Sequence, residues 1–170
     1  AFATIGPGLL ETRQVVEEGV IDKVGGRPLR IPPSPLLILL GATFLLLILL
    51  LPSRIAGYLG VLLWLSFFFI FDPINGRRGN RSIITEASRG KYHLLLSLLL
   101  AGIICGFLWE FWNYWARARW VYSLPYSFGP RIFEMPLFGY LGFPLLALEY
   151  FAFYSLSFGW KGGEDAHYND

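Results

Sequence analysis

Two glutamates inside apolar runs are the side chains of this sequence best placed to do chemistry. Glu110 and Glu149 each lie within a long, mostly apolar stretch. An ionised carboxylate is costly inside a bilayer, so each needs a partner or a proton. Such an acid can relay a proton, bind a cation or act as a general acid.

A structural interpretation of the same two acids is open as well. Their carboxylates can accept hydrogen bonds from polar and aromatic side chains of neighbouring helices, or pair with Arg117 or Arg119. No second catalytic element accompanies the glutamates, and the sequence lacks HExxH, P-loop and GxSxG motifs. Glu110 and Glu149 are therefore the only catalytic candidates, and we expect no enzyme activity.

A small and polar stripe runs along the stretch that contains Glu110. At 100° per residue, Gly102, Gly106 and Asn113 share one helix face with this acid. The two glycines form a GxxxG pair, which allows a second helix to approach closely in lipid. The stripe predicts helix packing, either within this chain or against a partner subunit.

Tryptophans cluster beside the same stripe, at Trp109, Trp112 and Trp115, and aromatic residues make up 18% of the chain. Such residues are typical of the aromatic belt at a membrane interface. The alternative is a stacking surface for a flat or polyene molecule. A bound lipid, carotenoid, quinone or chlorin would suit it, although we expect no obligatory cofactor.

Metal and haem sites are not expected. Cys105 is the only cysteine, and the two histidines, His93 and His167, lie at the edge of an apolar run and in the C-terminal tail. They cannot clamp a haem between helices. The net charge of +2 also gives no reason to expect a nucleic-acid partner.

The arginines lie between the apolar runs, where lipid headgroups would be. Arg77, Arg78 and Arg81 follow the second run, and Arg117 and Arg119 follow the third. Basic side chains at such positions anchor a protein to anionic headgroups. We therefore predict contacts with lipid headgroups or other anions at all five.

The elements that must position these residues are transmembrane helices. The chain is 55% hydrophobic and only 15% charged, whereas about a quarter of the residues of a soluble domain are charged. Four apolar runs cover residues 36–51, 55–71, 94–116 and 136–158. They predict an all-α, polytopic bundle of about four transmembrane helices, in which Asp72-Pro73 ends the second helix. Pro144 interrupts the fourth and predicts a kink or a half-helix there.

The predicted organisation is a cytoplasmic or interfacial segment at 1–33, a transmembrane domain at 34–160 and a tail at 161–170. Helix and strand patterns both fit the first segment. Ten of the 14 lysines and arginines flank the runs on the side of both termini, so the termini are expected in the cytoplasm. No signal-peptide pattern opens the sequence, and we interpret Ala1 as following a removed initiator methionine.

Two strings carry a resemblance to known proteins. WEFWNYW at 109–115 and FEMPLFGYLGFPLLALE at 133–149, with DPIN at 72–75, resemble a group of uncharacterised bacterial multi-pass membrane proteins. The resemblance covers about residues 72–154. It implies a bacterial inner-membrane protein and suggests no reaction.

Three functions are compatible with this pattern. The favoured hypothesis is a non-catalytic accessory or scaffold subunit of a larger membrane complex, photosynthetic or respiratory, that contacts lipids and other membrane subunits. The second is a membrane-embedded enzyme acting on a lipid or isoprenoid substrate through its two intramembrane glutamates. The third is a small proton-coupled transporter that uses Glu149.

Overall fold

The computed structural model describes residues 2–21, 24–122 and 129–159; the tail predicted at 161–170 lies outside them. The α-helices are α1 (Phe2–Gly19), α2 (Ser34–Leu50), α3 (Ser53–Ala56), α4 (Val61–Arg78), α5 (Ile83–Ser88), α6 (His93–Trp115) and α7 (Gly142–Phe158). Two 3-10 helices, η1 (Gly57–Leu59) and η2 (Leu137–Leu141), precede α4 and α7. The short strands β1 (Arg131–Ile132) and β2 (Met135–Pro136) pair antiparallel.

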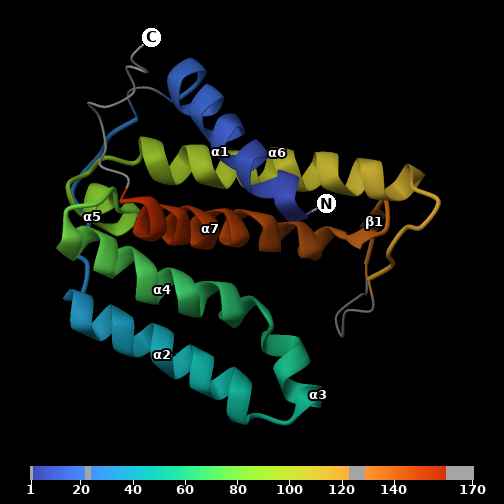
Figure 1. The fold of residues 1–170 in the computed structure, drawn as a ribbon, viewed down its shortest axis with the longest axis horizontal. Coiled ribbons are helices and arrows are strands. Elements are labelled where there is room, and N and C mark those ends of the chain that lie inside the picture. Colours follow the sequence, from blue (N-terminus) through green and yellow to red (C-terminus); the bar gives the residue numbers. More distant parts are fainter. Residues whose placement is uncertain (1, 22–23, 123–128, 160–170) are drawn as a thin grey trace.

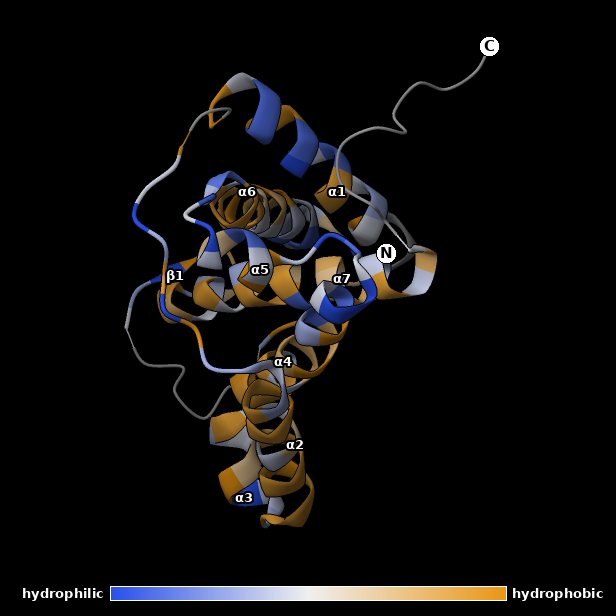
Figure 2. Cartoon of the chain, turned by 90° about the vertical axis from the view of Figure 1, so that its left-hand side faces the viewer, coloured by the Kyte–Doolittle hydropathy of each residue, from blue (hydrophilic) through white to orange (hydrophobic). Residues whose placement is uncertain are grey.

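The long helices lie in a row. Helix α2 packs on α4, α4 on α7, and α7 on α6, while α1 lies across α6 (Figure 1). The α2–α4 hairpin extends away from the other helices and is apolar over most of its length (Figure 2). The central contact, between α4, α6 and α7, is built from buried side chains that include Phe68, Leu94, Leu98 and Phe151.

Two of these helical segments are long and apolar enough to cross a membrane. They are α6 and the continuous segment of η2 and α7. Helix α4 with the α3–η1 segment before it makes a third if the two, bent by 64°, are counted as one span. Helix α2 is apolar but has only 17 residues. The predicted all-helical fold is therefore confirmed, with two to three candidate spans.

Helix α4 does not end where the sequence predicted. It continues through Asp72-Pro73 to Arg78, and Gly79 ends it in the left-handed conformation, with φ of 75°. Pro73 removes the backbone donor that would reach the carbonyl of Phe69. Tertiary contacts outweigh that loss, because Asp72, Pro73 and Asn75 are buried between α4 and its neighbours.

Asp72 holds the short helix α5 against α4. Its carboxylate accepts hydrogen bonds from the Ser82 hydroxyl at 2.8 Å and from the backbone N–H groups of Ile83 and Ile84, both at 2.9 Å. A carboxylate at a helix N-terminus satisfies donors that lack partners within the helix. The polar segment between the second and third apolar runs therefore contains a helix.

The N-terminal segment, for which the sequence left helix and strand open, is helical. Gly6, Leu9, Arg13 and Val16 of α1 are buried, and this spacing places them on one face of the helix. A side chain at position 6 would collide with the Tyr150 ring of α7, so the glycine lets the helices touch. Thr12 of α1 lies against Cys105, so this part of α1 lies beside the middle of α6.

Pro144, at which the sequence predicted a kink or a half-helix, does not interrupt α7. Pro144 lies in the first turn of α7, where a helix tolerates proline because the first N–H groups have no intrahelical acceptor. The 3-10 helix η2 covers the preceding residues. The fourth predicted run is therefore a 3-10 helix followed by an α-helix.

Candidate functional site

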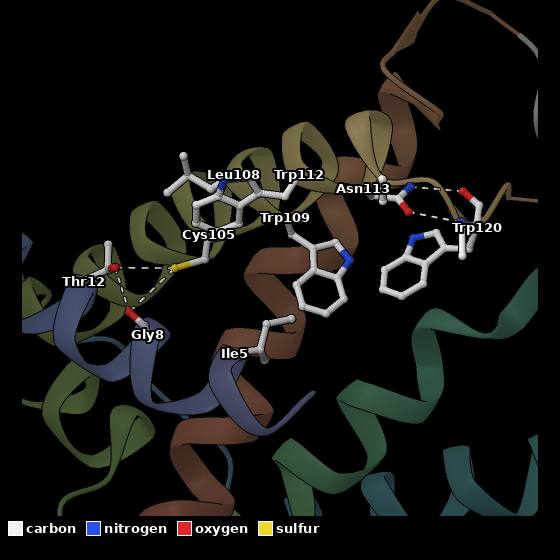
Figure 3. A pocket seen from close by; sticks show the side chains of 11 residues that line it. Ile5, Gly8, Thr12, Cys105, Leu108, Trp109, Trp112, Asn113 and Trp120 are labelled. Atoms are coloured by element: carbon white, nitrogen blue, oxygen red, sulfur yellow. Dashed lines mark hydrogen bonds between the residues drawn. The ribbon is translucent and has the colours of Figure 1, made fainter. Parts of the chain in front are cut away.

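A groove lies between α1 and α6. Its volume is about 610 Å³, within the usual size range of small-molecule sites. Ile5, Gly8 and Thr12 form the α1 wall, and Cys105 and Trp109 lie on the α6 wall (Figure 3). The groove extends along α6 from near its middle to its C-terminal end.

Two of the three tryptophans predicted to contact a hydrophobic ligand line this groove. Trp109 and Trp112 contribute to its wall, together with Trp120 from the segment after α6. Trp115 does not: its side chain is exposed and lies against Phe111 and Tyr114 at the helix end. Of the predicted set, Trp115 therefore fits the role of an interfacial aromatic residue.

Asn113 holds the segment after α6 in place at the end of the groove that is nearest the C-terminus of α6. Its side-chain amide donates to the carbonyl of Trp120 at 3.0 Å, and its carbonyl accepts from the Trp120 N–H at 3.1 Å. The Trp120 ring stacks on Trp109, with ring centroids 5.0 Å apart. Asn113 was predicted to pack helices; in the structure it holds Trp120 against α6.

Glu110 of α6 contacts the segment after α6 through Tyr122 and is fully buried. Its Oε1 accepts a hydrogen bond from Tyr122, whose hydroxyl in turn accepts one from the Trp120 indole at 2.8 Å. Burial, followed by the contact with Glu110, raises the pKa of Tyr122, which keeps its hydroxyl as a donor. Within the described residues no donor reaches the second oxygen, Oε2.

Glu149 is not brought to Glu110. Helices α6 and α7 are antiparallel, and Gly102 lies against Pro144. With a rise of about 1.5 Å per residue, Glu110 and Glu149 lie in opposite directions from this contact and roughly 20 Å apart along the helices. Glu149 is half-buried, and no described residue forms a hydrogen bond or ion pair with it.

The GxxxG pair is used inside the chain. A Cβ atom on Gly102 would lie 2.7 Å from the Pro144 Cα and 2.8 Å from the Phe143 carbonyl oxygen. One on Gly106 would lie 2.3 Å from the Phe143 ring. Both glycines therefore let α6 approach the start of α7, as the intrachain interpretation proposed.

The arginines predicted at lipid headgroups separate into two groups. Arg77, Arg78 and Arg117 have exposed side chains, whereas Arg81 is largely buried and pairs with Glu17 and Glu86. Burial lowers the pKa of Arg81, but these acids outweigh it and the net pKa is raised. Arg81 is therefore part of the internal packing.

Arg119 is also engaged, because it pairs with Glu134 at 3.2 Å and lies over the ring of Tyr114. Arg117, two residues earlier, has no ion pair with any described side chain. Of Arg117 and Arg119, both predicted to bind an anion, only Arg117 has no ion pair with a described residue.

Sequence reasoning missed the charged cluster that attaches α1. Arg13 and Arg81 both pair with Glu17, and His93 lies 3.6 Å from Glu17 and 3.3 Å from Glu86. These residues come from four segments, so no local pattern relates them. The i,i+4 spacing of Arg13 and Glu17 on the buried face of α1 was the one available signal.

Comparison with known proteins adds no assignment. The chain matches no protein-family model, no curated protein and no solved structure. The resemblance drawn from the sequence strings stays a prediction.

Proposed function

We propose that this chain is a polytopic inner-membrane protein of bacteria that serves as a non-catalytic accessory subunit and holds one lipophilic molecule in the groove between α1 and α6. On this proposal α2, α4, α6 and α7 each cross the bilayer, and the C-terminal end of α7 is cytoplasmic. Helix α1 enters the bilayer beside α6 from the same side, because Glu17 lies at the start of α6 and Thr12 lies against Cys105, so the N-terminal end that the sequence predicted in the cytoplasm lies at membrane depth. The groove then opens at the depth of the hydrocarbon core and extends toward the C-terminal end of α6.

The groove itself is the observation that carries the proposal. Ile5 and Gly8 on the α1 wall lie opposite Trp109 and Trp112 on the α6 wall, and the groove between the two walls has a volume of about 610 Å³. A Cβ atom on Gly8 would meet no heavy atom within 4 Å, so the space is open beside α1. Apolar and aromatic walls of this kind favour a hydrophobic occupant.

The placement of the acids supports a binding role over catalysis. An acid and a base that act on one substrate must both reach its reacting atoms. Glu110 and Glu149 lie at different levels of the helix pair, and neither is among the residues that line the groove. The contacts of Glu110 favour a part in holding Tyr122 and Trp120.

The ligand-binding part is tested with a neutral probe. We expect 9,10-dibromostearyl alcohol to quench the tryptophan fluorescence of the purified protein saturably, because bromine in the groove would contact Trp109 and Trp112. Gly8→Leu would fill the open space beside α1 and weaken binding by about tenfold or more.

Gly19→Leu is the matched control. Gly19 also lies on α1, and a Cβ atom added there would meet no heavy atom within 4 Å, but this glycine is at the far end of the helix from the groove. We expect the variant to bind the probe like wild type. Equal quenching in all three proteins would refute the groove as the binding site.

The accessory-subunit part needs a separate measurement. Gentle solubilisation of the source membrane followed by native mass spectrometry should find the chain in a stoichiometric complex with other membrane proteins. A lone monomer would contradict this part and leave the ligand-binding result unaffected.

A further inference from the structure

One face of α1 is exposed along the part of the helix that lies beside α6. Leu9, Arg13 and Val16 are buried, whereas Val15 is 67% exposed. At about 100° per residue, the exposed side chains from position 11 onward fall within about 100° of one another, opposite the buried ones. This outer face of α1 consists of Glu11, Gln14, Val15 and Glu18.

The outer face begins at the depth of the hydrocarbon core if α6 crosses the bilayer. Thr12 contacts Cys105, which is close to the middle of α6, and Glu17 lies 3.6 Å from His93 at the start of α6. Glu11 precedes Thr12 and therefore lies near the level of the middle of α6. No described residue forms a hydrogen bond or an ion pair with its carboxylate.

Lipid is an unfavourable cover for this face, because a carboxylate inside a bilayer is costly unless a cation or a donor reaches it. A second copy of the chain offers no suitable cation. Arg13 of α1 is buried and pairs with Glu17. The segments proposed to cross the bilayer contain no lysine or arginine at residues 34–50, 61–76, 93–115 and 137–158. A different chain is therefore the cover that the charges favour.

We propose that a transmembrane helix of a different subunit covers the outer face of α1 and places a lysine or arginine beside Glu11. Charged side chains within membranes pair with one another in this way. Val15 adds apolar contact, and Glu18, which accepts a hydrogen bond from Gln14 at 2.9 Å, extends the polar contact along the helix. This inference rests on the proposed function, because it names the chemistry of the partner in the same complex.

The test uses synthetic transmembrane peptides in place of the partner helix. Three leucine-alanine peptides differ only at the central residue, which is lysine, leucine or glutamate. Each is reconstituted with the protein in phosphatidylcholine vesicles, and energy transfer to a dye on Arg131→Cys, in a Cys105→Ala background, measures association. We expect the lysine peptide to bind about five- to tenfold more tightly than the leucine peptide. The glutamate peptide should bind no better than the leucine peptide.

Glu11→Gln should abolish the preference for lysine and leave the affinity for the leucine peptide unchanged. Glu149→Gln is the matched control, because Glu149 is also an acid of an apolar helix without a described partner, but it belongs to α7. It should keep the preference. Equal binding of the lysine and leucine peptides to wild type, or a preference that survives Glu11→Gln, would overturn the inference.

Crosslinking in the source membrane then identifies what covers the face. Benzoylphenylalanine in place of Val15 should give one discrete adduct with a different protein, and Glu11→Gln should lower its yield several-fold. The same group in place of Leu39, an exposed leucine of α2, should react with lipid. Adducts at position 15 with lipid or with a second copy of this chain would overturn the inference. A complex found by native mass spectrometry would still support the proposed function in that case.

Discussion

Asp72 is the side chain on which the junction of α4 and α5 depends most. It is fully buried, and its two oxygens accept three hydrogen bonds from Ser82, Ile83 and Ile84. We expect Asp72→Ala to lower the free energy of unfolding by about 2–4 kcal/mol, because buried N–H donors would lose their acceptor. Unfolding by denaturing detergent measures the change.

Glu11→Ala is the control for this prediction, because Glu11 is an exposed acid of α1. Its effect should stay within about 0.5 kcal/mol, as for most surface substitutions. Equal stability of the Asp72 and Glu11 variants would show that the carboxylate contributes no net stability to the junction.

The hydrogen bonds of Asn113 lead us to expect a local effect at the opposite end of the molecule from the α4–α5 junction. Asn113→Ala removes both hydrogen bonds to Trp120, so the segment after α6 should leave the helix more often. Trypsin cleaves after arginine, and we expect cleavage after Arg117 and Arg119 to become several-fold faster. Asn80→Ala, which removes a side-chain contact near α5, should leave this rate unchanged; acceleration in both variants would indicate general loosening.

At the scale of elements, glycine sets the distance between α6 and α7. Gly102→Ala would place a methyl group 2.7 Å from the Pro144 Cα, and the backbone cannot yield as a flexible side chain would. We expect a loss of about 1–3 kcal/mol, the usual cost of overpacking. The midpoint of thermal unfolding in a fixed detergent checks this.

Gly60→Ala provides the comparison for Gly102. The nearest atom to a Cβ at Gly60 is 3.8 Å away, and its backbone is helical. Because alanine favours helix more than glycine does, this variant should be unchanged or slightly more stable. A neutral Gly102→Ala would mean that the two helices are less closely packed than the structure describes.

We expect the charged cluster around Glu17 to hold α1 against the rest of the molecule. Glu17→Gln would weaken the contacts to Arg13 and Arg81, and the amide hydrogens of α1 should then exchange faster with solvent. Glu18→Gln changes an exposed neighbour whose partner is Gln14, so exchange should be unaffected. Identical exchange in the two variants would contradict an anchoring role for Glu17.

The sequence predicted those elements that apolar composition alone determines. Helix α6 was expected at 94–116 and found at His93–Trp115, and the apolar run at 36–51 corresponds to α2 at Ser34–Leu50. Elements that depend on tertiary contacts were missed. The continuation of α4 past Pro73 requires the burial of Asp72, which no local rule reveals.

The candidate site was predicted in part for the same reason. Trp109 and Trp112 could be identified because tryptophans on an apolar helix are conspicuous. The opposite wall was not foreseen, since Gly8 and Thr12 gain their role only when α1 packs beside α6. The interaction of Asn113 with Trp120 spans seven residues across a helix end, outside any helical or strand periodicity.

At the scale of the whole molecule, the row of helices differs from a compact bundle. Helix α2 packs mainly on α4, so leucines such as Leu39, Leu46 and Leu50 are exposed. A soluble monomer rarely exposes so many neighbouring apolar side chains. A lipid environment, in which exposed leucine is favourable, accounts for this surface.

The central claim is that these helices cross a bilayer, because the groove meets lipid only if α6 does. Single cysteines at Arg30, Arg54, Lys91 and Arg131, each in a Cys105→Ala background, can be labelled in sealed vesicles with a membrane-impermeant maleimide. The account predicts that positions 30 and 91 react from one side and positions 54 and 131 from the other. Labelling of positions 91 and 131 from the same side would contradict it.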